Sequence, residues 1–121
     1  MLTIRPQQIA ALEADVVRRF EKKSRRHFRE EFPEETRTMS DADCNEVVRR
    51  AVERGKRYGV TTERDVLLFA DLMLLKGRNF DQDASLAWVK KILLKTDMDG
   101  QTKMRTIYLR LAALEDRKPV S

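Results

Sequence analysis

The stretch TERDVLLFADLMLLKG, residues 62–77, decides the fold of this chain. Apolar side chains occupy most of its positions and, at about 100° per residue, they fall all around a helix. A helix that is apolar on every side is a buried helix, so we expect residues 63–76 to form the centre of a bundle. Thr62 and Asp65 are typical of a helix start, and Gly77 is typical of a helix end.

A long amphipathic helix is predicted before this stretch, from Pro6 to Phe32. Proline suits a first helical turn, where its missing N–H costs nothing, and Pro33 marks the end of the helix. At about 1.5 Å per residue the helix would span roughly 40 Å. Its apolar stripe drifts along its length, which indicates a bend or two successive contact surfaces. The stripe consists of Ile9, Leu12, Val16, Phe20, Ser24, Phe28 and Phe32.

Three more helices are predicted in the rest of the chain. Ser40 and Asp43 resemble a capping box at a helix start, and Gly59 suits the end of the same helix. The predicted helices cover residues 40–59, 84–95 and 101–116, and the predicted loops cover residues 34–39, 79–85 and 96–100. In the last helix we expect five buried residues: Met104, Ile107, Tyr108, Leu111 and Leu114.

The predicted fold is therefore all-α: a compact bundle of about five helices, with a long N-terminal helix and a central apolar third helix. The length of 121 residues fits one domain, residues 1–121. Within it, residues 117–121 predict a loose tail.

Composition limits the classes of protein to consider. Charged residues make up 37% of the chain, against about 25% in typical globular proteins. A single cysteine, Cys44, cannot form an internal disulfide. Apolar runs stay well short of the ~18 residues that a membrane span needs, and the opening residues 1–6 lack the apolar core of a signal peptide. These features predict a soluble, cytoplasmic protein.

Basic residues form a stripe on the N-terminal helix, and we call these six residues the α-stripe. They fall on one arc of about 120°, opposite Val16 and Phe20. Two interpretations stay open: a surface for phosphates or an acidic partner, or a solvated helix face. The α-stripe consists of Arg18, Arg19, Lys22, Arg25, Arg26 and Arg29. The second helix adds Arg49, Arg50, Arg54, Lys56 and Arg57, which would enlarge the basic surface if both faces point the same way.

Residues able to do chemistry are few, and each has a structural interpretation. His27 lies beside the apolar stripe, where a packed, hydrogen-bonded role is expected. Asp71 interrupts the most apolar helix and should pair with an arginine or lysine. Cys44 is expected in the core, and Asp99 in the segment 96–100 as a helix cap rather than a calcium ligand. We therefore predict no catalytic site, no metal site and no cofactor. The alternative is an enzyme with an unfamiliar site that combines Asp71 with His27.

Several short runs carry a family resemblance. The most distinctive is RYGVTTERDV at residues 57–66, a turn followed by a helix cap. The others include IRPQQ at 4–8, HFR at 27–29, FP at 32–33 and FADLM at 69–73. In these runs the chain resembles small helical proteins of proteobacteria that are encoded among type VI secretion components and their toxic effectors. The resemblance covers nearly the whole length, and it assigns no active-site residue.

The resemblance implies a role beside effectors. The expected function is a non-enzymatic accessory, adaptor or chaperone-like protein that binds a protein partner, such as a secreted effector or a spike component. One alternative is a nucleic-acid-binding protein that uses the α-stripe. A second alternative is an immunity protein that neutralises an effector.

Overall fold

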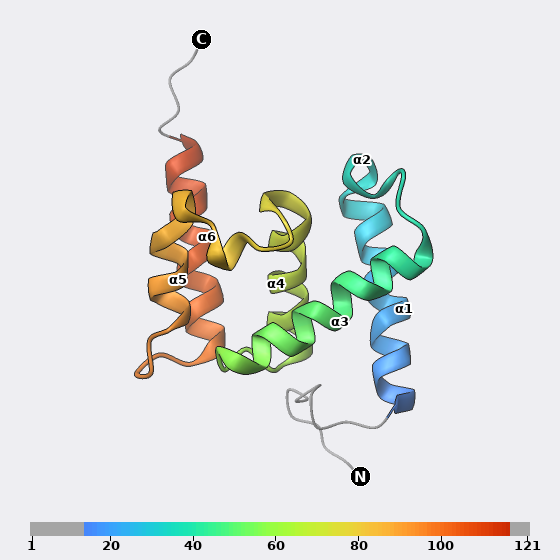
Figure 1. Ribbon diagram of the computed structural model, residues 1–121, viewed down its shortest axis with the longest axis horizontal. Coiled ribbons are helices and arrows are strands. Elements are labelled where there is room, and N and C mark those ends of the chain that lie inside the picture. Colours follow the sequence, from blue (N-terminus) through green and yellow to red (C-terminus); the bar gives the residue numbers. More distant parts are fainter. Residues whose placement is uncertain (1–13, 117–121) are drawn as a thin grey trace.

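The computed structural model describes residues 14–116, and this part of the chain is all-α, without a strand (Figure 1). The predicted N-terminal residues 6–13 and the predicted tail 117–121 lie outside the described residues. In chain order the elements are α1 (Ala14–Glu31), α2 (Pro33–Thr36), α3 (Asp41–Arg57), α4 (Glu63–Lys76), the 3₁₀ turns η2 (Phe80–Gln82) and η3 (Ala84–Leu86), α5 (Ala87–Leu93) and α6 (Gly100–Asp116).

Helix α4 lies at the centre of the bundle, as predicted. Figure 1 shows it between α1 on one side and the α5–α6 pair on the other, with α3 running across it. It contacts α1, α3, α6 and η2. Its buried apolar residues are Val66, Phe69, Ala70, Leu72 and Met73, whereas Leu67, Leu68 and Leu74 are half-buried and Leu75 is 45% exposed. Helix α4 is therefore buried on most of its sides and partly exposed on one.

Local capping chemistry sets the ends of α3 and α4. The Ser40 hydroxyl accepts from the Asp43 backbone N–H at 3.0 Å, and the Asp43 carboxylate accepts from the Ser40 N–H at 3.1 Å, which completes the predicted capping box. After α3, Gly59 adopts a φ of 76°, the left-handed conformation that glycine tolerates best. The Val60 N–H then reaches back to the Gly55 carbonyl at 2.8 Å, a bond of the Schellman type.

The predicted loops contain more structure than expected. Residues 34–39 include most of α2, because Pro33 occupies the first turn of a new short helix as well as ending α1. Residues 79–85 form the turns η2 and η3, and they bury both Phe80 and Asp81. The Phe80 ring packs on Phe69 of α4, with centroids 4.9 Å apart. Tertiary contacts therefore order this acidic segment.

The last two helices follow the predicted positions with small differences. Helix α5 begins at Ala87 because η3 occupies the residues before it, and α6 begins at Gly100. Met104 and Ile107 are fully buried, and Tyr108 and Leu111 are half-buried. The expected burial of Leu114 is wrong: this residue is 43% exposed, because the end of α6 extends past α5 (Figure 1).

A buried lysine joins the ends of three helices. Lys103 of α6 is 5% exposed, and its ammonium donates to the Tyr58 carbonyl at 2.7 Å and to the Leu93 carbonyl at 2.8 Å. Those carbonyls close α3 and α5, and the C-terminal ends of helices attract cations. Burial nevertheless lowers the pKa of Lys103. Lys103 therefore joins α3, α5 and α6 by hydrogen bonds to backbone carbonyls rather than by an ion pair with a buried carboxylate.

Candidate partner-binding site

The structure divides the α-stripe into two parts. Arg29 donates to the Thr36 carbonyl at 2.6 Å and to the Met39 carbonyl at 2.9 Å, and it pairs with Asp41 at 3.1 Å. Arg25 donates to the Asn45 side chain at 2.9 Å. Both arginines are half-buried. Both arginines are therefore used within the fold: Arg29 fastens α1 to the segment that leads into α3, and Arg25 fastens α1 to α3 itself.

The other members of the α-stripe are exposed: Arg18, Arg19, Lys22 and Arg26. Arg18 pairs with Asp15, one turn earlier on the same helix. For these four residues both predicted interpretations stay open: a partner-binding face or a solvated face.

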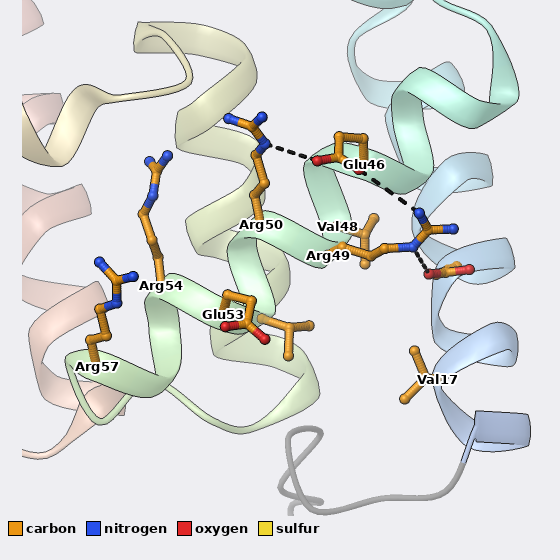
Figure 2. Close-up of a pocket in the computed structure, with 10 residues that line it drawn as sticks. Val17, Glu46, Val48, Arg49, Arg50, Glu53, Arg54 and Arg57 are labelled. Carbon is orange, nitrogen blue, oxygen red and sulfur yellow. Dashed lines mark hydrogen bonds and ion pairs between the residues drawn. The ribbon is translucent and has the colours of Figure 1, made fainter.

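A groove lies between α1 and the outer side of α3 (Figure 2). It has a volume of about 570 Å³. Three valines supply its apolar part, Val17 from α1 and Val48 and Val52 from α3. The charged residues that line it are Glu21, Glu46, Arg49, Arg50, Glu53, Arg54 and Arg57. We call this feature the α1–α3 groove.

Ion pairs hold several charged groups of the α1–α3 groove in place. Arg49 donates to Glu21 of α1 at 3.1 Å, and the Glu21 side chain is only 9% exposed. Arg50 donates to Glu46 at 3.0 Å, and Arg49 lies 3.8 Å from the same carboxylate. Figure 2 shows these contacts as a chain that runs from α3 to α1. Arg57 and Glu53 take part in no ion pair within the described part of the chain.

Arg54 is anchored away from the valines, at the far end of the groove. It pairs with Asp81 at 3.0 Å, donates to the Asn79 side chain at 2.7 Å and also donates to the Arg78 carbonyl. Asp81 is buried and also accepts from the Tyr58 hydroxyl at 2.7 Å. Burial and this carboxylate together raise the pKa of Tyr58 to about 12. Arg54 therefore stabilises the fold by binding Asp81 of η2, and it also lines the groove.

His27 and Asp71 come together, although their pairing differs from the prediction. The His27 Nε2 lies 3.0 Å from each carboxylate oxygen of Asp71, so the expected arginine or lysine partner is replaced by the histidine. Burial raises the pKa of Asp71 to about 6, although the hydrogen bond from His27 acts in the opposite direction. The His27 ring lies beside Phe28 and Phe32, at centroid distances of 6.0 and 5.9 Å. The packed, hydrogen-bonded role predicted for His27 is confirmed.

The remaining chemical candidates have structural positions. Cys44 is fully buried, and burial raises the pKa of its thiol, as expected for a core residue. The Asp99 carboxylate accepts from the Thr102 backbone N–H at 2.8 Å, so it caps α6 as predicted. Residues 14–116 contain no group of three or more histidine, cysteine or acidic residues placed to hold a metal ion. Over the same residues, no helix is long and apolar enough to cross a membrane.

The sequence shows the arginines of α3 but gives no sign of the groove that they line. Its floor needs Val17 and Val48 to meet across two helices, which no local pattern indicates. Comparisons of the chain with protein-family models, with curated proteins and with solved structures found no match in any of the three.

Proposed function

We propose that this chain is a non-enzymatic adaptor or chaperone-like protein that binds an effector or a spike component of a type VI secretion system. The observation that carries the proposal is the α1–α3 groove, in which three valines lie beside four arginines. Apolar side chains next to arginines are typical of protein-binding surfaces, where arginine is enriched and buried apolar contacts supply affinity. The resemblance to small helical proteins encoded beside effectors supplies the class of partner.

The ion pairs of the groove favour a protein partner over nucleic acid. Arg49, Arg50 and Arg54 already have carboxylate partners within the fold. Binding to nucleic acid depends on cations that neutralise phosphates, and the carboxylates of Glu46 and Glu53 oppose phosphates at the same surface. The exposed part of the α-stripe remains the better candidate for that alternative. Binding of a labelled DNA duplex that weakens steeply with salt would support it.

Co-expression tests the proposed function. The tagged chain is produced together with each effector and spike protein encoded beside its gene, and an unrelated helical protein with the same tag is the control. We expect one of these proteins to co-elute at a fixed ratio in size-exclusion chromatography with light scattering. Failure of every neighbouring effector and spike protein to co-elute would contradict the proposal. A complex that abolishes the toxicity of an effector would assign the immunity role instead.

A further inference from the structure

The middle part of α1 exposes only basic side chains. From residue 18 to residue 26 the exposed side chains are Arg18, Arg19, Lys22, Lys23 and Arg26, and we call these five residues the outer cation face. The one carboxylate in this stretch, Glu21, is buried and paired with Arg49 of α3. Helix α1 as a whole has seven basic and four acidic residues, so it contributes +3 to the net charge of +5. The positive charge of the chain is therefore concentrated on this helix.

Most of the outer cation face is not used by the fold. Arg18 pairs with Asp15 of the same helix, and the Lys23 ammonium lies 3.3 Å from the carboxylate of Glu63 in α4. Glu30 stands one turn after the last of the five cations and is exposed, but it forms no ion pair with any residue between 14 and 116. Within the same part of the chain, three of the five cations have no ion-pair partner: Arg19, Lys22 and Arg26.

The three unpaired cations point to the same side of α1, away from the bundle. Arg19, Lys22 and Arg26 follow one another at steps of three and four, which places them on one helix face. They extend over about 10 Å along the axis, the length of about three base pairs of a DNA duplex. Val17, which lines the α1–α3 groove, is nine positions from Arg26 and so lies about half a turn away around the helix. Figure 1 shows α1 at one edge of the bundle, where this side is open to a large ligand.

The composition of the outer cation face favours phosphates over an acidic protein. Protein-binding sites take their affinity from buried apolar contacts with arginine beside them, and this face exposes no apolar side chain between residues 18 and 26. Binding to a nucleic acid backbone needs only cations that neutralise phosphates and release counterions. Both phenylalanines of α1, Phe20 and Phe28, are buried, so this helix offers no exposed phenyl ring for the stacking of an unpaired base. A duplex therefore fits the face better than a single strand.

We propose that the outer cation face binds the phosphate backbone of double-stranded DNA without sequence preference. Arg19, Lys22 and Arg26 each donate charge-assisted hydrogen bonds to phosphate oxygens, and each neutralises one phosphate. Arg18 and Lys23 keep their carboxylate partners in this complex. The inference goes beyond the proposed function and does not depend on it, because the α1–α3 groove lies on the other side of α1 and stays free.

The salt dependence of DNA binding tests this inference. Fluorescence anisotropy measures the binding of a labelled duplex of random sequence, ~20 base pairs long, between ~20 and ~200 mM salt. Three neutralised phosphates predict a slope of log K against log salt of about −2.7, or a loss of affinity of about fortyfold between ~50 and ~200 mM salt. Lys22→Gln/Arg26→Gln removes two of the three contacts. The slope should then fall to about −0.9, and affinity at ~20 mM salt should be at least tenfold weaker.

Matched variants separate the outer cation face from general charge. Lys91→Gln/Arg105→Gln removes the same charge at exposed positions of α5 and α6. It should leave the slope unchanged and the affinity within twofold of wild type. Arg19→Gln alone should reduce the steepness of the slope by about 0.9, and it keeps the test valid if the Lys22→Gln/Arg26→Gln variant fails to fold. Circular dichroism and the melting temperature of each variant establish that it is folded.

Several results would overturn the inference. It fails if wild type does not bind the duplex at ~20 mM salt, where electrostatic binding is strongest, or if a single strand of the same length binds more tightly than the duplex. It also fails if both double variants lose affinity equally, because binding would then follow net charge and not this face. An acidic helical peptide that binds wild type more tightly than the duplex, and binds Lys22→Gln/Arg26→Gln less tightly than wild type, would assign the face to an acidic protein instead.

The proposed function is tested separately by co-elution with the neighbouring effector and spike proteins. Loss of co-elution with wild type would contradict the proposed function and leave the DNA-binding inference standing. Co-elution together with absent DNA binding would do the opposite.

Discussion

At the scale of single residues, the buried charged side chains of this protein are stabilised by different kinds of hydrogen-bond partner. Lys103 has two backbone carbonyls at helix ends, and no carboxylate among residues 14–116 forms an ion pair with it. Asp81 has both an arginine and a tyrosine hydroxyl. Asp71 has a histidine and lies in surroundings that favour its protonated form. These three residues give the clearest stability tests.

Replacing Lys103 by methionine should destabilise the fold by about 2–4 kcal/mol. The substitution keeps most of the apolar stem but leaves the carbonyls of Tyr58 and Leu93 without their charged donor, and buried carbonyls without partners are costly. Urea denaturation measures the change. Lys95→Met, at an exposed position after α5, is the control and should change the free energy of unfolding by less than ~0.5 kcal/mol. Equal effects of the two substitutions would show that Lys103 does not join the helix ends.

The Asp71 carboxyl should make stability fall as the pH rises from about 4 to about 6. Its pKa of about 6 in the folded chain lies above the usual 3.8, so the folded chain holds this proton more tightly than the unfolded chain. Stability is therefore greatest below the unfolded pKa and is lost as the carboxyl ionises. About two pKa units correspond to ~3 kcal/mol.

Asp71→Asn removes this titration and isolates its effect. Relative to wild type, the variant should gain about 3 kcal/mol of stability between pH 4 and pH 7, measured by urea denaturation at each pH. The groups facing Asp71 are His27 and Glu31 of α1 and Tyr108 of α6, and they remain in both proteins. Glu115→Gln, at an exposed position, serves as a control. A constant difference between Asp71→Asn and wild type across the pH range would refute the account.

At the scale of elements, the stability of the fold depends on the burial of α4. Leu72→Asp places a charge without a partner in the buried side of α4, at a cost of several kcal/mol, against a total stability of ~5–15 kcal/mol for a domain. We expect no folded protein by circular dichroism and thermal melting. Leu75→Asp changes the same helix at a 45% exposed position and should cost less than about 1 kcal/mol. A folded Leu72→Asp variant with a normal melting temperature would show that α4 is not central.

The two parts of the α-stripe should also separate by experiment. Arg29→Glu removes two bonds to backbone carbonyls and puts a carboxylate beside Asp41, so we expect a loss of about 2–4 kcal/mol. Lys22→Glu, on the exposed part, should change stability by no more than ~0.5 kcal/mol. Melting curves of the two variants give the comparison. Similar melting temperatures for the two variants would show that Arg29, like Lys22, contributes nothing to stability and belongs to the solvated face.

The elements predicted well are those whose ends carry their own signals. The Ser40–Asp43 and Thr62–Asp65 caps and the glycine after each helix define α3 and α4 locally, and the apolar pattern of α4 predicts its central place. The turns η2 and η3 were missed because tertiary contacts order them: Phe80 packs on α4, and Asp81 is held by Arg54 and Tyr58. An acidic segment without helical periodicity predicts only a loop.

At the scale of the whole molecule, charge pairing decides which surface is left for binding. The sequence places twelve lysines and arginines in two helices without showing which of them are used inside the fold. In the structure, Arg25 and Arg29 join α1 to α3, and Arg54 joins α3 to η2. The α1–α3 groove arises only from the packing of two helices, so its position was beyond the sequence patterns. What remains at its rim is a set of exposed arginines and glutamates beside two half-buried valines.

The claim that the partner binds the α1–α3 groove is tested most directly by the affinity of the co-purified effector or spike protein for groove variants. Isothermal titration calorimetry compares wild type, Arg50→Gln/Arg57→Gln and the matched distal variant Lys91→Gln/Arg105→Gln, each shown to be folded by its melting curve. The account predicts affinity at least tenfold weaker for the groove variant and within twofold of wild type for the distal variant. Equal affinities for all three proteins would contradict it.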